Sequence, residues 1–329
     1  MQNTWYPWLN KTYKNIIQNY QNGKLHHTIL IESYSINNTY KIIWAIIRWI
    51  LCHKKHGIKN CGKCIGCTLI KNNIHPDCYI IHAKNTNNII EIKKIRHIID
   101  MIKNTAQQKH DKILWIPDYS LLTIFGINAL LKIIEEPPEN TFFFIGNKFY
   151  NNIHSTFRSR CILYKIFTPN EKIGLSWMQK NTTIKKKTCL LALRINNNDP
   201  ELANKLLKNK NWIQRIQLYN NIHYAINKNN FLTLLPYLNT DDIINKIYWI
   251  ILLFLDSMKL QKKIFSYLIN IDQIPLITQI SQNYSYITLN NIVHSWVQCR
   301  YLLTTVNNIN YELLILNQLL KWQILKKKS

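Results

Sequence analysis

Four cysteines lie close together in the first quarter of the chain. They are Cys52, Cys61, Cys64 and Cys67, spaced C-x8-C-x2-C-x2-C, and Gly57, Gly62 and Gly66 stand among them. Closely spaced thiolates suit a tetrahedral Zn²⁺ site, and glycine permits the tight turns that such a site needs. Because four protein ligands leave no open position, the predicted zinc is structural, within a module at about residues 52–78. The same thiolates could carry an iron–sulfur cluster or form a redox pair.

A second candidate site combines the run Asn128–Pro138 (NALLKIIEEPP) with Ser159-Arg160-Cys161. Together they resemble the signature of clamp-loader ATPases, which belong to the AAA+ family. In oligomeric ATPases of this kind, the arginine between Ser and Cys reaches the γ-phosphate in the neighbouring subunit. The resemblance therefore implies that Arg160 is an arginine finger acting in trans, where it would stabilise transition-state charge. Taken alone, Arg160 could equally pair with a surface carboxylate.

The phosphate-binding loop of such an ATPase is missing. It requires G-x-x-x-x-G-K-[ST] after a strand, because glycines let backbone N–H groups approach the phosphates and the Lys and hydroxyl reach phosphate and Mg²⁺. The segment from Glu32 to Lys41 contains no glycine. Its register places Thr39 at the Lys position and Tyr40 at the hydroxyl position. This loop is degenerate.

Two further positions have lost the residues that ATP hydrolysis needs. Where a carboxylate pair should hold Mg²⁺, the chain has Pro117-Asp118. Where related ATPases place an arginine against the γ-phosphate, the register gives Glu201, whose charge would repel that phosphate. We therefore expect no bound ATP and no catalysis by this chain alone.

The elements that position these residues alternate between apolar strands and helix-length segments. Such strands predict a parallel sheet covered on both faces, an α/β domain. The resemblance to clamp-loader ATPases implies that this domain is of the P-loop NTPase type. The expected strands are Thr28–Ile31, Cys78–His82, Ile113–Ile116 and Thr141–Ile145. Between the last two, a helical apolar stripe ends at Pro137-Pro138.

After Pro169 the pattern becomes helical. We expect three domains: an α/β domain over residues 1–168 with the zinc module inserted, a small helical domain over 169–208, and an all-helical C-terminal domain over 209–329. The clamp-loader resemblance implies that the first is AAA+-like, the second a lid, and the third the collar domain of an oligomer.

The composition sets limits on partners and location. The 42 Lys+Arg against 17 Asp+Glu give a formal charge of +25, but only seven of the basic residues are Arg and the chain is rich in Ile, Asn and Lys. This bias indicates an AT-rich genome, so charge alone does not establish DNA binding. The longest apolar run is too short to span a bilayer, and no signal peptide is visible. We expect a soluble, cytoplasmic protein with no membrane partner.

The whole pattern resembles the delta-prime family of clamp-loader subunits from bacterial DNA polymerase III. The resemblance rests on Trp5–Trp8, His26-His27, the four-cysteine insert, Asn128–Pro138 and Ser159-Arg160-Cys161. It implies an ATPase-inactive stator that assembles with gamma/tau ATPase subunits and a delta subunit. Through that complex it would act on the sliding clamp and primer-template DNA during replication.

Two other functions compete with this interpretation. An active ATPase subunit would need an intact Gly-Lys-[Ser/Thr] and two carboxylates at 117–118, which the sequence lacks. A zinc-dependent nucleic-acid-binding protein without a clamp-loader role would instead use the positive charge, and its DNA affinity would fall steeply with salt.

Overall fold

The computed structural model describes residues 5–81, 89–103, 111–149, 151–208, 210–240, 242–306 and 310–327. The chain forms two compact units, Met1–Thr168 and Pro169–Ser329. Each unit has its own buried core. The expected division of the second unit at residue 208 stays a prediction.

The first unit is built on a five-stranded sheet with the order β2-β3-β4-β1-β5, and all of its strand pairs are parallel. The strands are β1 (Thr28–Ser33), β2 (Cys78–Ile80), β3 (Lys112–Ile116), β4 (Thr141–Lys148) and β5 (Ile162–Ile166). This architecture confirms the predicted α/β fold. The β2 strand is shorter than expected, and His82 lies outside the described residues. The strand β5 was not predicted.

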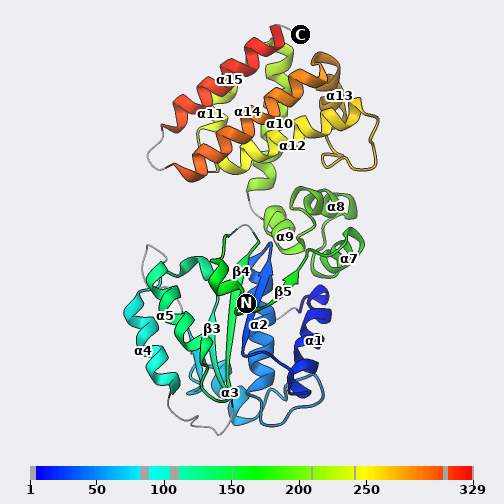
Figure 1. Ribbon diagram of the computed structural model, residues 1–329. Coiled ribbons are helices and arrows are strands. Elements are labelled where there is room, and N and C mark those ends of the chain that lie inside the picture. The colour runs from blue at the N-terminus through cyan, green and yellow to red at the C-terminus, as the bar shows by residue number, and fades with distance from the viewer. Residues whose placement is uncertain are drawn as a thin grey trace. The chain divides into compact units, whose positions relative to one another are not determined.

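Helices cover both faces of this sheet (Figure 1). On one side lie α1 (Asn10–Gln21) and α2 (Ile36–Ile50), and on the other lie α4 (Ile92–Lys103) and α5 (Ile124–Glu135). The short elements are η1 (Pro7–Leu9), α3 (Ile65–Lys71), η2 (Tyr119–Leu121) and α6 (Ser155–Arg158). Alternation along β3 explains the two layers, because Leu114 packs with α4 and α5 whereas Trp115 lies against Tyr40 of α2.

The second unit is helical, as predicted. Its helices are α7 (Glu171–Asn181), α8 (Lys186–Ile195), α9 (Pro200–Lys208), α10 (Asn211–Lys228), η3 (Phe231–Leu234), α11 (Leu235–Leu238), α12 (Ile243–Gln261), α13 (Ile274–Asn283), α14 (Tyr286–Thr305) and α15 (Tyr311–Lys327). None of the helices in the described residues has the length and apolar character needed to cross a membrane.

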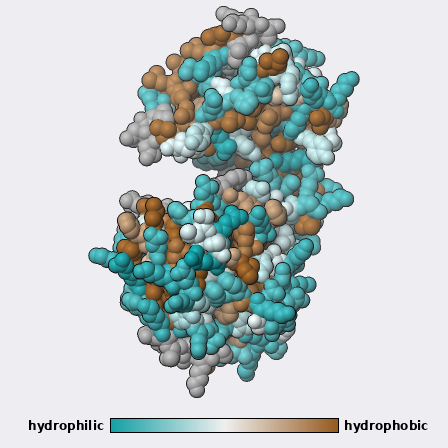
Figure 2. Space-filling model, in the orientation of Figure 1, coloured by the Kyte–Doolittle hydropathy of each residue, from teal (hydrophilic) through white to brown (hydrophobic). Residues whose placement is uncertain are grey.

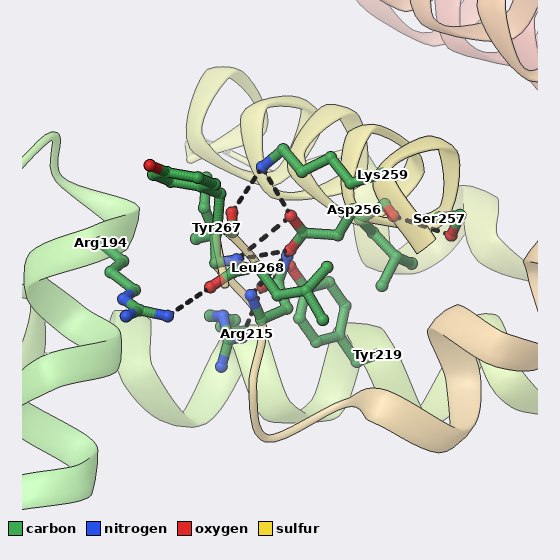
Figure 3. A network of polar contacts seen from close by, with 11 residues as sticks. Arg194, Arg215, Tyr219, Asp256, Ser257, Lys259, Tyr267 and Leu268 are labelled. Atoms are coloured by element: carbon green, nitrogen blue, oxygen red, sulfur yellow. Dashed lines mark hydrogen bonds and ion pairs between the residues drawn. The ribbon is translucent and has the colours of Figure 1, made fainter. Parts of the chain in front are cut away.

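A buried polar network organises the segment between α12 and α13 (Figure 3). The carboxylate of Asp256, which is fully buried, accepts hydrogen bonds from the backbone N–H groups of Ile269 and Asn270 at 2.7–3.1 Å. Arg215, also fully buried, donates to Asp272 at 2.8 and 2.9 Å and to the Asn270 side chain at 2.8 Å. Buried charges are stable only when paired and hydrogen-bonded in this way.

The same segment contacts α8 on its other side. Arg194 donates to the carbonyl of Leu268 at 2.7 Å and forms an ion pair with Glu171 at 2.8 Å (Figure 3). The Tyr248 hydroxyl of α12 adds a bond to the Ile195 carbonyl at 3.1 Å. These contacts join α7 and α8 to the bundle formed by the later helices.

Candidate functional site

The four predicted cysteine ligands converge in the structure. Their sulfur atoms all lie within 4.8 Å of one another, and the Sγ atom of Cys52 is 3.5 Å from that of Cys61 and 3.9 Å from that of Cys64. These separations exclude disulfides, whose S–S bond is about 2.05 Å. They suit a tetrahedral metal with Zn–S bonds of about 2.3 Å, which place the sulfurs about 3.8 Å apart. The donor set therefore fits a tetrahedrally coordinated metal ion.

Backbone amides donate hydrogen bonds that favour the thiolate form of these sulfurs, whereas burial raises the pKa of Cys52 to about 12 and also raises that of Cys67. The N–H groups of Cys61, Cys64 and Cys67 donate to the sulfurs of Cys52, Cys61 and Cys64, respectively, at 3.3–3.5 Å. Burial opposes ionisation of Cys64, but the N–H groups of Cys67 and His53 outweigh it and lower its pKa to about 6. A thiolate is the form that ligates metal.

The backbone geometry favours glycine at three positions of the module. Gly57 and Gly62 have φ values of 57° and 75°, in the left-handed region that favours glycine. A Cβ on Gly66 would lie 2.3 Å from the Leu51 carbonyl oxygen, so only glycine lets α3 pack this closely.

Arg160 lies in the turn between α6 and β5. Its guanidinium forms an ion pair with Glu135, the last residue of α5, and donates to the Thr156 carbonyl at 2.8 Å. The side chains of Arg160 and Glu135 are 37% and 48% exposed, so the pair is accessible to another molecule. The structure thus joins the two signature segments, Asn128–Pro138 and Ser159-Arg160-Cys161, directly.

The neighbours of Arg160 hold its turn in place. Ser159 Oγ donates to the Thr156 carbonyl at 3.0 Å, and Cys161 Sγ donates to the Phe157 carbonyl at 3.2 Å. Both bonds tie the turn to carbonyl groups at the end of α6. Burial raises the pKa of Cys161 to about 12, which makes it a packing residue and a poor nucleophile.

A third signature segment reaches the same region. Nε2 of His27, just before β1, is 3.0 Å from the carbonyl oxygen of Ile134, next to Glu135. As that carbonyl can only accept, the imidazole donates. Arg160, Glu135 and His27 therefore gather at the amino edge of the sheet, where the parallel strands begin.

The degenerate phosphate loop lies at the opposite, carboxyl edge, where α2 begins. Thr39 is buried and its hydroxyl donates to the Ile36 carbonyl at 2.8 Å. Tyr40 packs on Trp115 with ring centroids 4.6 Å apart. The ammonium group of Lys41 lies 3.5 Å above the ring of Tyr6. The side chains at the start of α2 are thus engaged within the protein.

The other positions predicted to have lost function also serve local roles. Asp118 caps η2, since its carboxylate accepts from the N–H and hydroxyl of Ser120 at 3.0 and 2.7 Å. Next to it, the Pro117 carbonyl oxygen lies only 2.2 Å from where a Cβ on Gly146 would stand. In the second unit, Glu201 pairs with Lys205 at 3.2 Å, one helical turn away.

Sequence reasoning did not identify Glu135 as the partner of Arg160, although the Glu135-Glu136 pair lay within the recognised run. It also missed the anchors of the metal module. The tip of the module is held by Trp49, which donates to the Gly57 carbonyl at 3.0 Å, and by Tyr13, which donates to the Ile58 carbonyl at 2.7 Å. No pattern in the sequence marks such long-range bonds.

Comparison with known proteins places this arrangement in a family. Residues 8–170 match the family described as "DNA polymerase III, delta subunit", and residues 209–323 match its C-terminal family, "DNA polymerase III, delta subunit, C terminal". DNA polymerase III subunit delta' from Buchnera aphidicola of Acyrthosiphon pisum is 42% identical over 97% of both chains. The Escherichia coli K12 delta' is 31% identical over 96% of this chain and 95% of its own.

A weaker similarity extends to a gamma subunit. DNA polymerase III subunit gamma of Buchnera aphidicola from Schizaphis graminum is 29% identical over 46% of this chain and 41% of its own. The two family matches together span most of the chain, and the delta' relatives align along nearly all of it. The chain belongs to the DNA polymerase III delta-prime subunit family.

Proposed function

We propose that this chain is the ATPase-inactive stator of a clamp loader and supplies Arg160 to the ATP site of a neighbouring subunit. The observation that carries the proposal is the placement of Arg160 at the amino edge of the sheet, opposite the degenerate phosphate loop. An arginine there cannot serve the chain's own nucleotide position. It is exposed, and a turn bonded to α6 orients it for an anionic group on another subunit.

The expected partners are gamma/tau ATPase subunits and a delta subunit, with the sliding clamp and primer-template DNA contacted through the complex. The sequence similarity to a gamma subunit supports a fold shared by part of this chain and such a partner. The second unit offers surfaces for such assembly. Figure 2 shows hydrophobic surface on the second unit. Exposed side chains of α14 and α15 include Tyr301, Leu313 and Ile324, at 65%, 61% and 55%. Exposed apolar patches mark protein interaction sites.

The four-cysteine cluster has a supporting role in this proposal. The four thiolates would hold Zn²⁺ with no coordination position left for substrate, so the metal would stabilise the insert and take no part in chemistry.

The test is reconstitution of the loader from this chain and its organism's gamma/tau and delta subunits. ATP turnover is measured with clamp and primed DNA for the wild-type chain, for Arg160→Ala and for Arg158→Ala. Arg158 is the matched control, because it is an exposed arginine two residues earlier in the same segment. We expect Arg160→Ala to assemble normally and to lower turnover severalfold, since an arginine finger lowers the barrier at its site.

Arg158→Ala should behave as wild type, and the chain alone should not hydrolyse ATP. Equal turnover of the Arg160→Ala and wild-type complexes would remove the finger from the mechanism. Hydrolysis by the isolated chain would overturn the stator assignment.

A further inference from the structure

The metal module is strongly and uniformly basic. Between Cys52 and Lys71 the chain has five lysines and no carboxylate, and no Asp or Glu occurs from Ser33 to Pro76. A zinc ion held by four thiolates carries a net charge of about −2, so five ammonium groups exceed it. The module therefore keeps a positive surface when its metal is bound.

Most of these lysines point to solvent without a partner carboxylate. Lys54, Lys59, Lys63 and Lys71 are exposed, and within the described residues no ion pair holds any of them. Lys55 differs, because its ammonium group lies over the rings of Trp49 and Tyr20 at 4.7 and 5.1 Å. The four others are available to an external anion.

The lysine side chains are not needed as hydrogen-bond donors to the cysteine sulfurs. Within the described residues, the hydrogen bonds to cysteine sulfur in this module come from the backbone amides and from Asn60, whose side chain donates to Cys67 at 3.7 Å. The backbone N–H groups of Lys54 and Lys63 are among these donors, but within the described residues no lysine ammonium group donates to sulfur. The hydrogen bonds therefore assign the lysine side chains no role in the metal site.

The segment that carries the lysines is fixed in position. His56 and Lys59 form a small antiparallel bridge around Gly57, and the Trp49 and Tyr13 side chains bond the carbonyls at its tip. A rigid basic loop loses little conformational entropy on binding an anion.

The surface fits the backbone of duplex DNA better than a single strand or an acidic protein. Residues 52–71 contain no Phe, Tyr or Trp on which unpaired bases could stack. Of the apolar side chains in that segment, Ile65 alone is strongly exposed, at 67%, which is little for the centre of a protein interface. We propose that the four-cysteine module binds the phosphates of duplex DNA through Lys54, Lys59 and Lys63, a contact additional to the arginine finger.

The test measures binding of the full-length chain, with its metal, to a fluorescent 20-base-pair duplex (about two helical turns) across a salt series. Each phosphate contact lowers the slope of log K against log salt by about 0.9, so three contacts predict a loss of about 40-fold between about 50 and about 200 mM salt. The variant Lys54→Gln/Lys59→Gln/Lys63→Gln should reduce the steepness of that slope by about 2.7 and weaken binding at least about tenfold.

The matched control is Lys185→Gln/Lys186→Gln/Lys187→Gln, which removes three exposed lysines of the other unit and the same charge from the formal +25. We expect it to bind as wild type. The variant Lys54→Arg/Lys59→Arg/Lys63→Arg should retain affinity, because phosphate contacts need only the charge. Equal losses in both Gln variants, failure of the Arg variant to bind, or no duplex binding by the wild type would each overturn the proposal.

A metal content of one ion per chain and an unchanged circular dichroism spectrum confirm that the Gln variant is folded. Because the loader ATPase assay with Arg160→Ala uses a different residue and readout, failure of either proposal is distinguishable from failure of the other.

Discussion

Arg160 and Glu135 form an ion pair at the amino edge of the sheet, joining the turn before β5 to the end of α5. The pair gives the arginine a defined partner in the isolated chain. For Arg160 to reach a phosphate on another subunit, the guanidinium must exchange Glu135 for that phosphate. On the proposed function, Glu135 therefore competes with that phosphate for Arg160.

Replacing Glu135 with Gln should release the arginine at little cost to the fold. An exposed ion pair contributes about 0–1 kcal/mol, so the free energy of unfolding should change by no more than that. The same energy would favour release, and we expect ATP turnover of the assembled loader to rise by at most about fivefold. A fall as large as that of Arg160→Ala would instead show that Glu135 positions the finger.

Removing the metal should loosen the module and leave the sheet intact. A chelator that extracts the metal removes the metal–sulfur bonds that hold the four cysteines together, so amide hydrogen exchange should increase across residues 52–71. The strands β1, β3 and β4 serve as the internal control. Native mass spectrometry should find one zinc ion per chain, and Cys61→Ser/Cys64→Ser should lose it. Strong visible absorption would identify an iron–sulfur cluster instead.

Replacing Asp256 with Ala should destabilise the second unit by about 3–5 kcal/mol, the range for breaking a buried charged pair. The change leaves the Ile269 and Asn270 amides and Lys259 without their carboxylate acceptor. Chemical denaturation checks the value. The control, Asp100→Ala, removes a 74% exposed carboxylate paired with Lys103 and should change stability by less than about 0.5 kcal/mol. Equal effects of the two substitutions would contradict a stabilising role for the network.

His27 should make stability fall on acidification. Burial and the neighbouring His26 lower the pKa of His27 below its usual 6.5. The unfolded chain therefore binds a proton at this position at a higher pH than the folded chain does, and unfolding is favoured as pH falls through about 6.5. The denaturation midpoint should drop between pH 7.5 and 5.5, and less in His27→Gln. The exposed His97 provides the control substitution, and an identical pH profile for His27→Gln and the wild type would contradict the prediction.

Elements with strong local signals were predictable from the sequence. The buried strands β1, β3 and β4 are continuous apolar runs, and the cysteine spacing alone indicated that four sulfurs lie together. The edge strand β5 was not recognised, because it carries an exposed Ile162 and Lys165 in a half-buried pattern. Its position depends on pairing with β1, which is a long-range contact.

The partners of the functional residues were harder to predict. Arg160 contacts Glu135, and Lys41 lies over Tyr6, because the folded chain brings together elements that are separate in the sequence. Sequence spacing sets helix faces and strand faces, but such pairs depend on how the elements pack.

The two edges of the sheet also give the chain a polarity. A subunit with an arginine at one edge and no nucleotide loop at the other can complete a neighbour's site, yet no neighbour can complete a site in it. In a ring of related subunits it would interrupt the succession of ATP sites at one place. On the proposed function, such a ring would have a seam at this chain, one boundary between subunits that holds no ATP site.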